Sequence, residues 1–179
     1  MRLFIGIGVS GELKEKVSEV QKRFREFDIK FVEKENLHFN LKFLGEVPED
    51  KIAEIKDVMT KIGSQFENFT INIAGINAFP NKNYVKVLFL EVKEGRETMN
   101  AIADVLELGL GKSDKPFIPH LTLGRVKSVQ DREKLKSLLR EMQNIEIGKM
   151  EVSKIKLIKS DLAPSGPIYQ DVFTTKLGS

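Results

Sequence analysis

The sequence predicts an α+β fold made of two lobes that are related by internal duplication. Segments with the two-residue period of strands alternate along the chain with segments of helical period. The only two histidines of the chain stand in the same local frame, HFNL at 38–41 and HLTL at 120–123. Each half of the chain contains one of these motifs, so we expect one bilobal domain spanning residues 1–179.

The N-terminal segment reads as a strand followed by a helix. Apolar side chains alternate along residues 2–9, which indicates a strand. Ser10 is a typical N-cap residue, and apolar side chains then recur at helical spacing as far as Phe27. The next two strands are expected at 28–33 and 36–45, the second of which contains the first histidine motif.

The middle of the chain repeats this alternation. Pro48 is placed to open a second helix, whose apolar stripe runs to Phe66. Strands are expected at 69–78 and 84–92, on either side of a turn at the residues PNKN.

The C-terminal part contains the second motif. An apolar stripe over 99–106 predicts a third helix, and the loop GLGKSDKP leads from it to a strand at 119–126 with the second histidine. A fourth helix is expected over 129–142. Strands at 145–159 and 168–177 follow, with the tight loop APSGP between them.

Composition excludes several classes of protein. The chain has no cysteine, so disulfides, thiolate catalysis and zinc–thiolate sites are ruled out. No segment has the pattern of a signal peptide or a membrane span, and we expect a cytoplasmic protein, a monomer without a protein partner. A formal net charge of +3 permits a phosphate-bearing ligand without requiring one.

Strand alternation gives the two motifs a chemical face. Side chains at i and i+2 of a strand point the same way, so Thr122 should lie beside His120. Strict alternation puts Arg125 on the core side with Leu123, so a bulge or strand end is needed to bring it to the cleft. In the first motif, the expected apolar face consists of Leu37, Phe39, Leu41 and Phe43, and the opposite face of His38, Asn40 and Lys42.

Two histidines that face one cavity suit acid–base chemistry. With an ordinary pKa near 6.5, one imidazole can be neutral and the other protonated near neutral pH. A hydroxyl such as that of Thr122 can hold phosphate oxygens. Two histidines are too few for a typical zinc site, although a site of two histidines and a carboxylate stays open. No P-loop, dinucleotide-binding glycine motif or serine elbow occurs.

Four segments, in order, resemble one known family. The stretches RLFIGIGV, ENLHFNLKFLGEV, FIPHLTLGRVK and KSDLAPSGPIYQ are similar to the first strand, the two H-x-T-L motifs and the S-x-L-x-P-x-G-P-x-Y segment of the two-histidine (2H) phosphoesterases. Within that superfamily, the sequence resembles the archaeal and bacterial RNA 2′,3′-cyclic phosphodiesterases, also called 2′-5′ RNA ligases. The resemblance covers nearly the whole chain.

The resemblance implies a fold and a reaction. Two antiparallel sheets would line a central cleft, with helices on the outside. His38 and His120 would act as general acid and general base, and Thr122 would donate to a phosphate oxygen. The implied reaction hydrolyses RNA ends or nucleotides that carry a 2′,3′-cyclic phosphate to 2′-phosphates, with no metal or cofactor. The same site can join a ribose 5′-hydroxyl to the cyclic phosphate as a 2′-5′ linkage.

Asn40 departs from the family pattern, which has threonine at this position. Its amide can also donate to a phosphate oxygen, so we interpret it as a phosphate contact. Lys42 and Arg125 are further candidates for phosphate binding, with a solvated strand-end lysine as the equal alternative for Lys42. Tyr169 is a candidate for base stacking, whereas core packing is the better explanation for Phe4.

Two other functions are compatible with the sequence. One is a non-catalytic or weakened module that binds RNA ends, which Asn40 would mark. The other is a 2H phosphoesterase that acts on small cyclic nucleotides. The intact pair of histidines argues against the first, because binding alone would tolerate lysine or arginine at those positions. A wide basic surface beyond the cleft would favour RNA over a small substrate.

Overall fold

The computed structural model of the protein describes all 179 residues. Four helices and nine strands follow one another along the chain, with short 3₁₀ turns at Lys34–Asn36 and Glu49–Lys51. Their bounds are β1 Arg2–Gly8, α1 Gly11–Lys22, β2 Asp28–Phe31, β3 His38–Glu46, α2 Ile52–Gln65, β4 Phe69–Asn81, β5 Tyr84–Val92, α3 Arg96–Leu110, β6 His120–Ser128, α4 Arg132–Glu141, β7 Glu146–Val152, β8 Lys154–Ala163 and β9 Gly166–Lys176.

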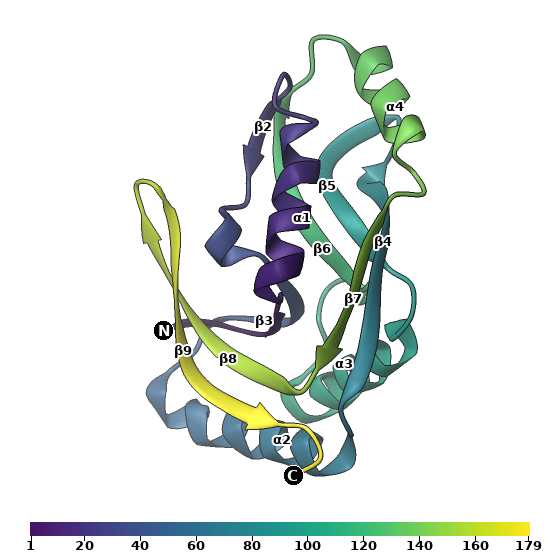
Figure 1. Ribbon diagram of the computed structural model, residues 1–179. Coiled ribbons are helices and arrows are strands. Elements are labelled where there is room, and N and C mark those ends of the chain that lie inside the picture. The colour runs from purple at the N-terminus through teal and green to yellow at the C-terminus, as the bar shows by residue number, and fades with distance from the viewer.

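The strands form one antiparallel assembly in two halves (Figure 1). The order is β7-β4-β5-β6-β3-β1-β8-β9, and β2 pairs with β6. The halves meet between β6 and β3, where only Phe39 and Leu121 are paired. The predicted α+β class is confirmed, and the two expected sheets are the two halves on either side of this single pair.

The chain order supports an internal duplication. The series β1-α1-β3-α2 in the first part of the chain recurs as β5-α3-β6-α4 in the second. In both series the strand that carries the histidine pairs with the first strand, β3 with β1 and β6 with β5. The histidines therefore occupy corresponding places in the two halves.

The expectation of one strand over residues 145–159 was wrong. Two strands occupy the region: β7 pairs with β4 in one half, and β8 pairs with β1 in the other. Ser153 lies between β7 and β8, and at this residue the chain passes from one half to the other. The alternation of apolar and polar side chains shifts there, because Ser153 and Lys154 are both polar between Val152 and Ile155. This shift is the only mark of the crossing in the sequence.

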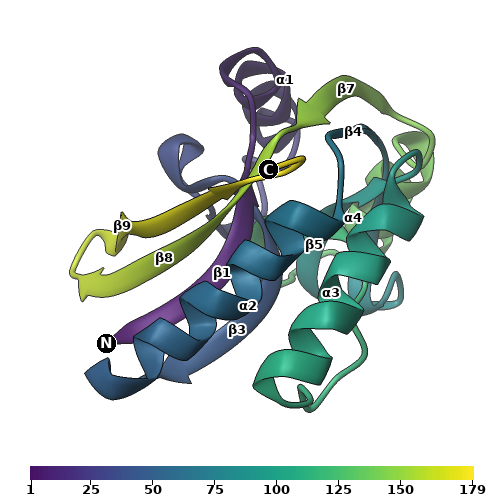
Figure 2. The same cartoon turned by 90° about the horizontal axis from the view of Figure 1, so that it is seen from below.

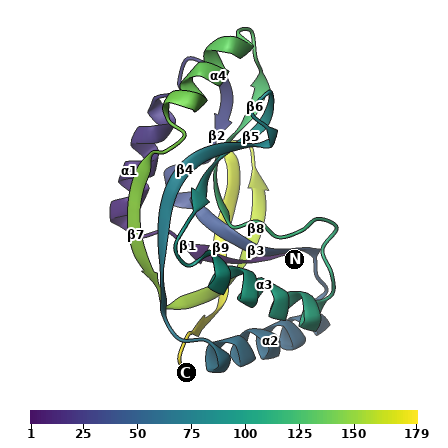
Figure 3. The ribbon, with the colours of Figure 1, turned by 90° about the vertical axis from the view of Figure 1, so that its right-hand side faces the viewer.

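Helices bind the two halves together. Helix α1 packs on β7, and α2 lies beside α3 and β9 (Figures 2 and 3). One continuous cluster of 34 buried apolar residues runs through both halves. Helix α1 ends at Lys22 rather than near Phe27 as expected, but Phe24 in the following turn is still fully buried. None of the helices combines the length and the apolar character that crossing a membrane would require.

Candidate active site

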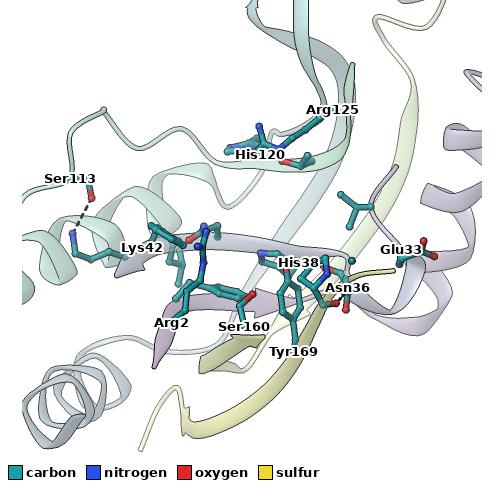
Figure 4. A pocket seen from close by; sticks show the side chains of 18 of the residues that line it. Arg2, Glu33, Asn36, His38, Lys42, Ser113, His120, Arg125, Ser160 and Tyr169 are labelled. Carbon is teal, nitrogen blue, oxygen red and sulfur yellow. Dashed lines mark hydrogen bonds between the residues drawn. The ribbon is translucent and has the colours of Figure 1, made fainter. Parts of the chain in front are cut away.

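A cavity of about 570 Å³ lies where the two halves meet (Figure 4). Both histidines line it, together with Asn40 and Thr122. The structure thus brings together the four polar residues that the two motifs place at equivalent positions. Nowhere in the chain do three or more aspartate, glutamate or histidine side chains form a group that could hold a metal ion.

The strand register explains this arrangement. Phe39 of β3 is paired with Leu121 of β6 in antiparallel orientation, and both side chains are fully buried. The neighbours of a pair in an antiparallel ladder lie opposite each other and point to the other face. His38 therefore lies across from Thr122, and Asn40 lies across from His120. Each half contributes one imidazole and one hydrogen-bond donor to the same patch of the cavity wall.

Both imidazoles are held in the same way. The Nδ1 atom of His38 lies 2.7 Å from the carbonyl oxygen of Asn36, and Nδ1 of His120 lies 2.7 Å from that of Ile118. A carbonyl oxygen only accepts hydrogen bonds, so Nδ1 must carry the proton in both rings. The Nε2 atoms form no hydrogen bond within the protein, and each can accept a proton or, once protonated, donate one.

Aromatic rings pack against both imidazoles. The ring of His38 lies 4.6 Å from that of Phe4 and 5.3 Å from that of Tyr169, measured between centroids. His120 meets the stacked rings of Phe79 and Phe89 edge-on, at 5.1 and 5.4 Å. These contacts restrict the imidazoles and remove much of the water around them.

The pKa of each histidine lies below its ordinary value of 6.5. For His38 the main cause is burial, which disfavours the charged ring; the bond to Asn36 opposes this, and the charge of His120 lowers the pKa further. For His120 the main cause is again burial, opposed by the bond to Ile118, and the charge of Arg125 adds to it. A charge on His120 therefore disfavours a charge on His38.

Asn40 has its amide in an unusual environment. Its Oδ1 atom is buried and has no hydrogen-bond partner. The Nδ2 atom also forms no bond within the protein, but it is not buried, so it is the end of the amide that a ligand in the cavity can reach. This orientation fits the interpretation of Asn40 as a donor to a phosphate oxygen.

A bulge in each motif strand changes the predicted faces. In β3, Gly6 pairs with Asn40 and Ile5 with Lys42, so Leu41 is an extra residue. In β6, Phe89 pairs with Thr122 and Leu88 with Gly124, which leaves Leu123 as the corresponding extra residue. A bulge reverses the alternation beyond it. This second bulge is the irregularity that the sequence required for Arg125, which is exposed and lines the cavity near His120.

The first bulge makes two sequence expectations wrong. Phe43, expected in the core, is 52% exposed and lies in the cavity under the guanidinium of Arg2, whose Cζ is 5.2 Å from the ring centre. Lys42, expected either to reach a phosphate or to be a solvated strand-end lysine, lines the cavity but is buried. Its ammonium donates to Glu107 Oε1 at 2.9 Å, to Gly111 O at 2.7 Å and to Ser113 Oγ at 3.0 Å. All three N–H groups are used, which leaves none for a phosphate.

Tyr169 is the candidate for base stacking, a role that stays a prediction. It lines the cavity from β9, and its ring touches Phe4 and His38 edge-on. Burial raises the pKa of its hydroxyl, which stays protonated at neutral pH. The β8–β9 hairpin that carries Tyr169 is tied to the site by Asn36, whose Nδ2 donates to Pro167 O at 2.9 Å.

Other wall residues had no signal in the sequence. Arg2 reaches the cavity from the start of β1, and the loop between α3 and β6 contributes Ser113 and residues 115–118. The sequence predicts only an irregular loop for this segment. Its pairing with Lys42 and Glu107 depends on contacts between residues distant in the chain, which periodicity does not report.

Residues 10–164 match the 2'-5' RNA ligase superfamily. The chain belongs to this superfamily. It is 39% identical to a protein of Methanothermobacter thermautotrophicus named RNA 2',3'-cyclic phosphodiesterase, over 99% of each chain. A protein of the same name from Methanocaldococcus jannaschii is also 39% identical, over 95% of this chain and 97% of the relative.

Two solved structures have the same fold. A protein of Thermus thermophilus matches with a TM-score of 0.85 and 28% identity, over 99% of this chain and 98% of its own. Escherichia coli LigT in complex with phosphate matches with a TM-score of 0.78 and 21% identity, over 99% and 98%. At 21% identity, the comparison with LigT shows a shared fold and nothing more.

Proposed function

We propose that this protein hydrolyses 2′,3′-cyclic phosphate ends of RNA to 2′-phosphate ends, with His38 and His120 as its acid–base pair. One observation carries the proposal: two imidazoles at corresponding strand positions are both held through Nδ1, with both Nε2 atoms free in one cavity. The names of relatives that are 39% identical over nearly the whole chain support the same substrate class.

The reaction needs one proton removed and one delivered. Neutral His120 takes a proton from water through Nε2 while the water oxygen attacks phosphorus. The bond between phosphorus and the ribose O3′ breaks, and the His38 imidazolium transfers its Nε2 proton to O3′. The product has a 2′-phosphate and a free 3′-hydroxyl. His120 is then protonated and His38 neutral, and exchange with solvent restores the starting state.

Charge on the phosphate is stabilised by fixed donors. The amide of Asn40 and the hydroxyl of Thr122 flank the imidazoles and can donate to the non-bridging oxygens as charge develops on them. Arg125 adds a positive charge on the same strand as His120. With a ribose 5′-hydroxyl in place of water, the same transfer forms a 2′-5′ linkage.

The assignment of the base to His120 rests on Arg125. The charge of this arginine lowers the pKa of His120 and so favours the neutral ring that a base requires. The charge of His120 also lowers the pKa of His38. This second effect disfavours the protonated ring that an acid requires. A substrate whose leaving group needs no proton separates the two roles experimentally.

An assay with two substrates tests this function against its alternatives. A cyclic mononucleotide and an RNA that ends in a cyclic phosphate are incubated with the protein in EDTA, and phosphorus NMR identifies the product. We expect 2′-phosphate from both. Binding of RNA without turnover would indicate an RNA-end binding module, and turnover of the mononucleotide alone would indicate a small-molecule enzyme. Loss of turnover in EDTA, restored by Zn²⁺ or Mn²⁺, would indicate a metal-dependent reaction.

The expectation of a monomer stays a prediction, which sedimentation equilibrium at assay concentrations checks.

A further inference from the structure

A second hollow, of about 500 Å³, adjoins the candidate active site. It lies between the β4–β5 turn, the end of β6 and the start of α4. Arg125 lines both this hollow and the catalytic cavity. We call it the basic groove, and define it by Lys82, Tyr84, Lys86, Arg125, Lys127 and Arg132.

The charge of the basic groove is entirely of one sign. Five of its 12 lining residues are lysine or arginine, and none is acidic. None of these five cations takes part in any ion pair of the protein. The chain as a whole has 29 basic and 26 acidic residues, so a cluster without acidic partners is a local departure from a nearly balanced composition. Unpaired cations gathered in a hollow favour an anionic ligand.

An aromatic ring lies among these cations. Tyr84 is 50% exposed. The Nζ of Lys86 is 5.4 Å from its ring centre and the Cζ of Arg132 is 5.6 Å from it. Cations along a groove with an exposed aromatic platform are the combination that binds single-stranded nucleic acid, because phosphates meet the charges and a base stacks on the ring.

The basic groove continues from the catalytic cavity. Strand β6 begins at His120 and ends at Ser128, and Arg125 projects from it beside the cavity (Figure 4). At about 3.3 Å per residue, the backbone positions of His120 and Arg125 are separated by about 16 Å. Lys127, two residues further along β6, also lines the groove. A ligand that leaves the histidines along β6 therefore meets one cation after another.

We propose that the basic groove binds the RNA strand upstream of the cyclic end. This inference rests on the proposed function. A ribose whose 2′,3′-cyclic phosphate lies at the histidines is joined through its 5′ oxygen to the preceding nucleotide. That nucleotide's phosphate meets Arg125, the next phosphates meet Lys127 and Arg132, and a base stacks on Tyr84. The substrate class is then single-stranded RNA, and a mononucleotide uses only the catalytic cavity.

Kinetics with substrates of different length test the groove. For the unmodified protein, we expect kcat/KM to rise by about ten-fold or more from a cyclic mononucleotide to an octanucleotide with a cyclic end, because several phosphate contacts are added. The double variant Lys127→Ala/Arg132→Ala should lose most of this gain and keep mononucleotide hydrolysis within about two-fold. Tyr84→Ala should lower octanucleotide kcat/KM by roughly five- to a hundred-fold, the range for one stacked base.

A matched variant separates local contacts from net charge. Lys61→Ala/Lys154→Ala removes the same charge from two exposed lysines that line neither hollow and form no ion pair. It should behave as the unmodified protein does on both substrates. An equal loss in this variant, or an octanucleotide that is no better than the mononucleotide, would overturn the groove as a binding site.

Measuring how tightly the protein binds a reaction product tests the groove independently of catalysis. An octanucleotide with a 2′-phosphate end is titrated at several salt concentrations. The slope of log affinity against log salt should become shallower by about 0.7 for each phosphate contact that is removed. If no cyclic phosphate is hydrolysed, the proposed function fails while this titration still decides the groove. Unchanged RNA binding, with binding to anionic phospholipid vesicles lost instead, would assign the surface to a membrane and overturn the inference.

Discussion

At the scale of single residues, the tautomer of each histidine is set by the backbone. The carbonyls of Asn36 and Ile118 accept from Nδ1 of the ring two residues later. They also stabilise the imidazolium that forms when Nε2 takes up a proton, which opposes the effect of burial on the pKa. The same contact therefore suits both roles, and the surroundings of each ring decide between acid and base.

The lowered pKa values predict the pH dependence of the reaction. The base must be neutral, so the rate rises as pH increases through its pKa; the acid must be protonated, so the rate falls as pH increases through its own. Because both pKa values lie below 6.5 in the free protein, kcat/KM should follow a bell whose maximum lies below pH 6.5. The measurement is kcat/KM for a cyclic mononucleotide against pH. A rate that rises steadily into the alkaline range would contradict an imidazolium acid.

Asn40 is expected to contribute a single donor to the phosphate. Asn40→Ala removes the amide that faces the cavity and should weaken transition-state binding by about 1–3 kcal/mol, the usual range for a hydrogen bond to a charged group. The measurement is kcat/KM for a cyclic phosphate, with circular dichroism as the check on folding. Full activity in this variant would remove Asn40 from the chemistry.

A second variant is Asn40→Thr, which gives the first motif the threonine that the second motif has at position 122. A β-branched side chain suits a strand, and the change removes the buried, unpartnered Oδ1 atom, so stability should hold or rise slightly. Activity within a few-fold of the original would show that asparagine stands in for threonine. A clear acceleration would indicate that Asn40 weakens the catalyst.

At the scale of the elements, the bulges at Leu41 and Leu123 separate what the sequence predicts from what it does not. Up to the bulge, alternation places His38 and Asn40 correctly. Beyond it, alternation places Phe43 in the core, whereas the structure puts it in the cavity. A bulge is one unpaired residue, determined by the partner strand, and the motif sequence contains no sign of it.

The second bulge depends on a buried amide. Gln21 of α1 donates through Nε2 to the carbonyl oxygen of Leu123 at 2.9 Å and to that of Val32 at 3.0 Å. Gln21→Met keeps the volume but removes both bonds, so it should lower the free energy of unfolding by about 1–3 kcal/mol. Urea denaturation measures this loss. Gln130→Met, at an exposed position, is the control and should change stability little; equal losses would show that the bonds of Gln21 are unimportant.

The Lys42–Glu107–Ser113 network should make stability depend on acid pH. Bonds from Ser113, and the bond and charge of Lys42, lower the pKa of Glu107 from 4.5 to about 2. A carboxylate with a lowered pKa stabilises the folded state above pH 4.5, and this contribution is lost as pH falls towards about 2.

The variant Glu107→Gln tests this contribution. It should unfold with a free energy on the order of 1–3 kcal/mol lower at neutral pH, because it weakens charged hydrogen bonds to the buried Lys42. The difference from the original protein should shrink as pH is lowered from 4.5 towards 2. Denaturation at a series of pH values measures it, and a difference independent of pH would contradict an ionised Glu107.

At the scale of the whole molecule, the sequence predicted the fold class and the convergence of the two motifs. Each motif carries its own apolar residues, and pairing of their buried neighbours Phe39 and Leu121 brings the polar faces together. The passage at Ser153 was not predicted, because the shift in alternation at Ser153 and Lys154 does not show that β8 pairs with another strand than β7 does. The basic groove was likewise hidden, since its residues come from two distant stretches of the chain, 82–86 and 125–135, which only the fold brings together.

The duplicated architecture makes one claim central: the two histidines divide the work of acid and base on one phosphate. A cyclic phosphate whose bridging 3′ oxygen is replaced by sulfur tests it, because a thiolate leaves without a proton. On the ordinary substrate, His38→Ala and His120→Ala should each lose on the order of 10²-fold or more in rate. On the sulfur substrate, His38→Ala should regain most of its activity and His120→Ala should not. Rescue of His120→Ala instead would reverse the two roles, and rescue of neither variant would contradict the division itself.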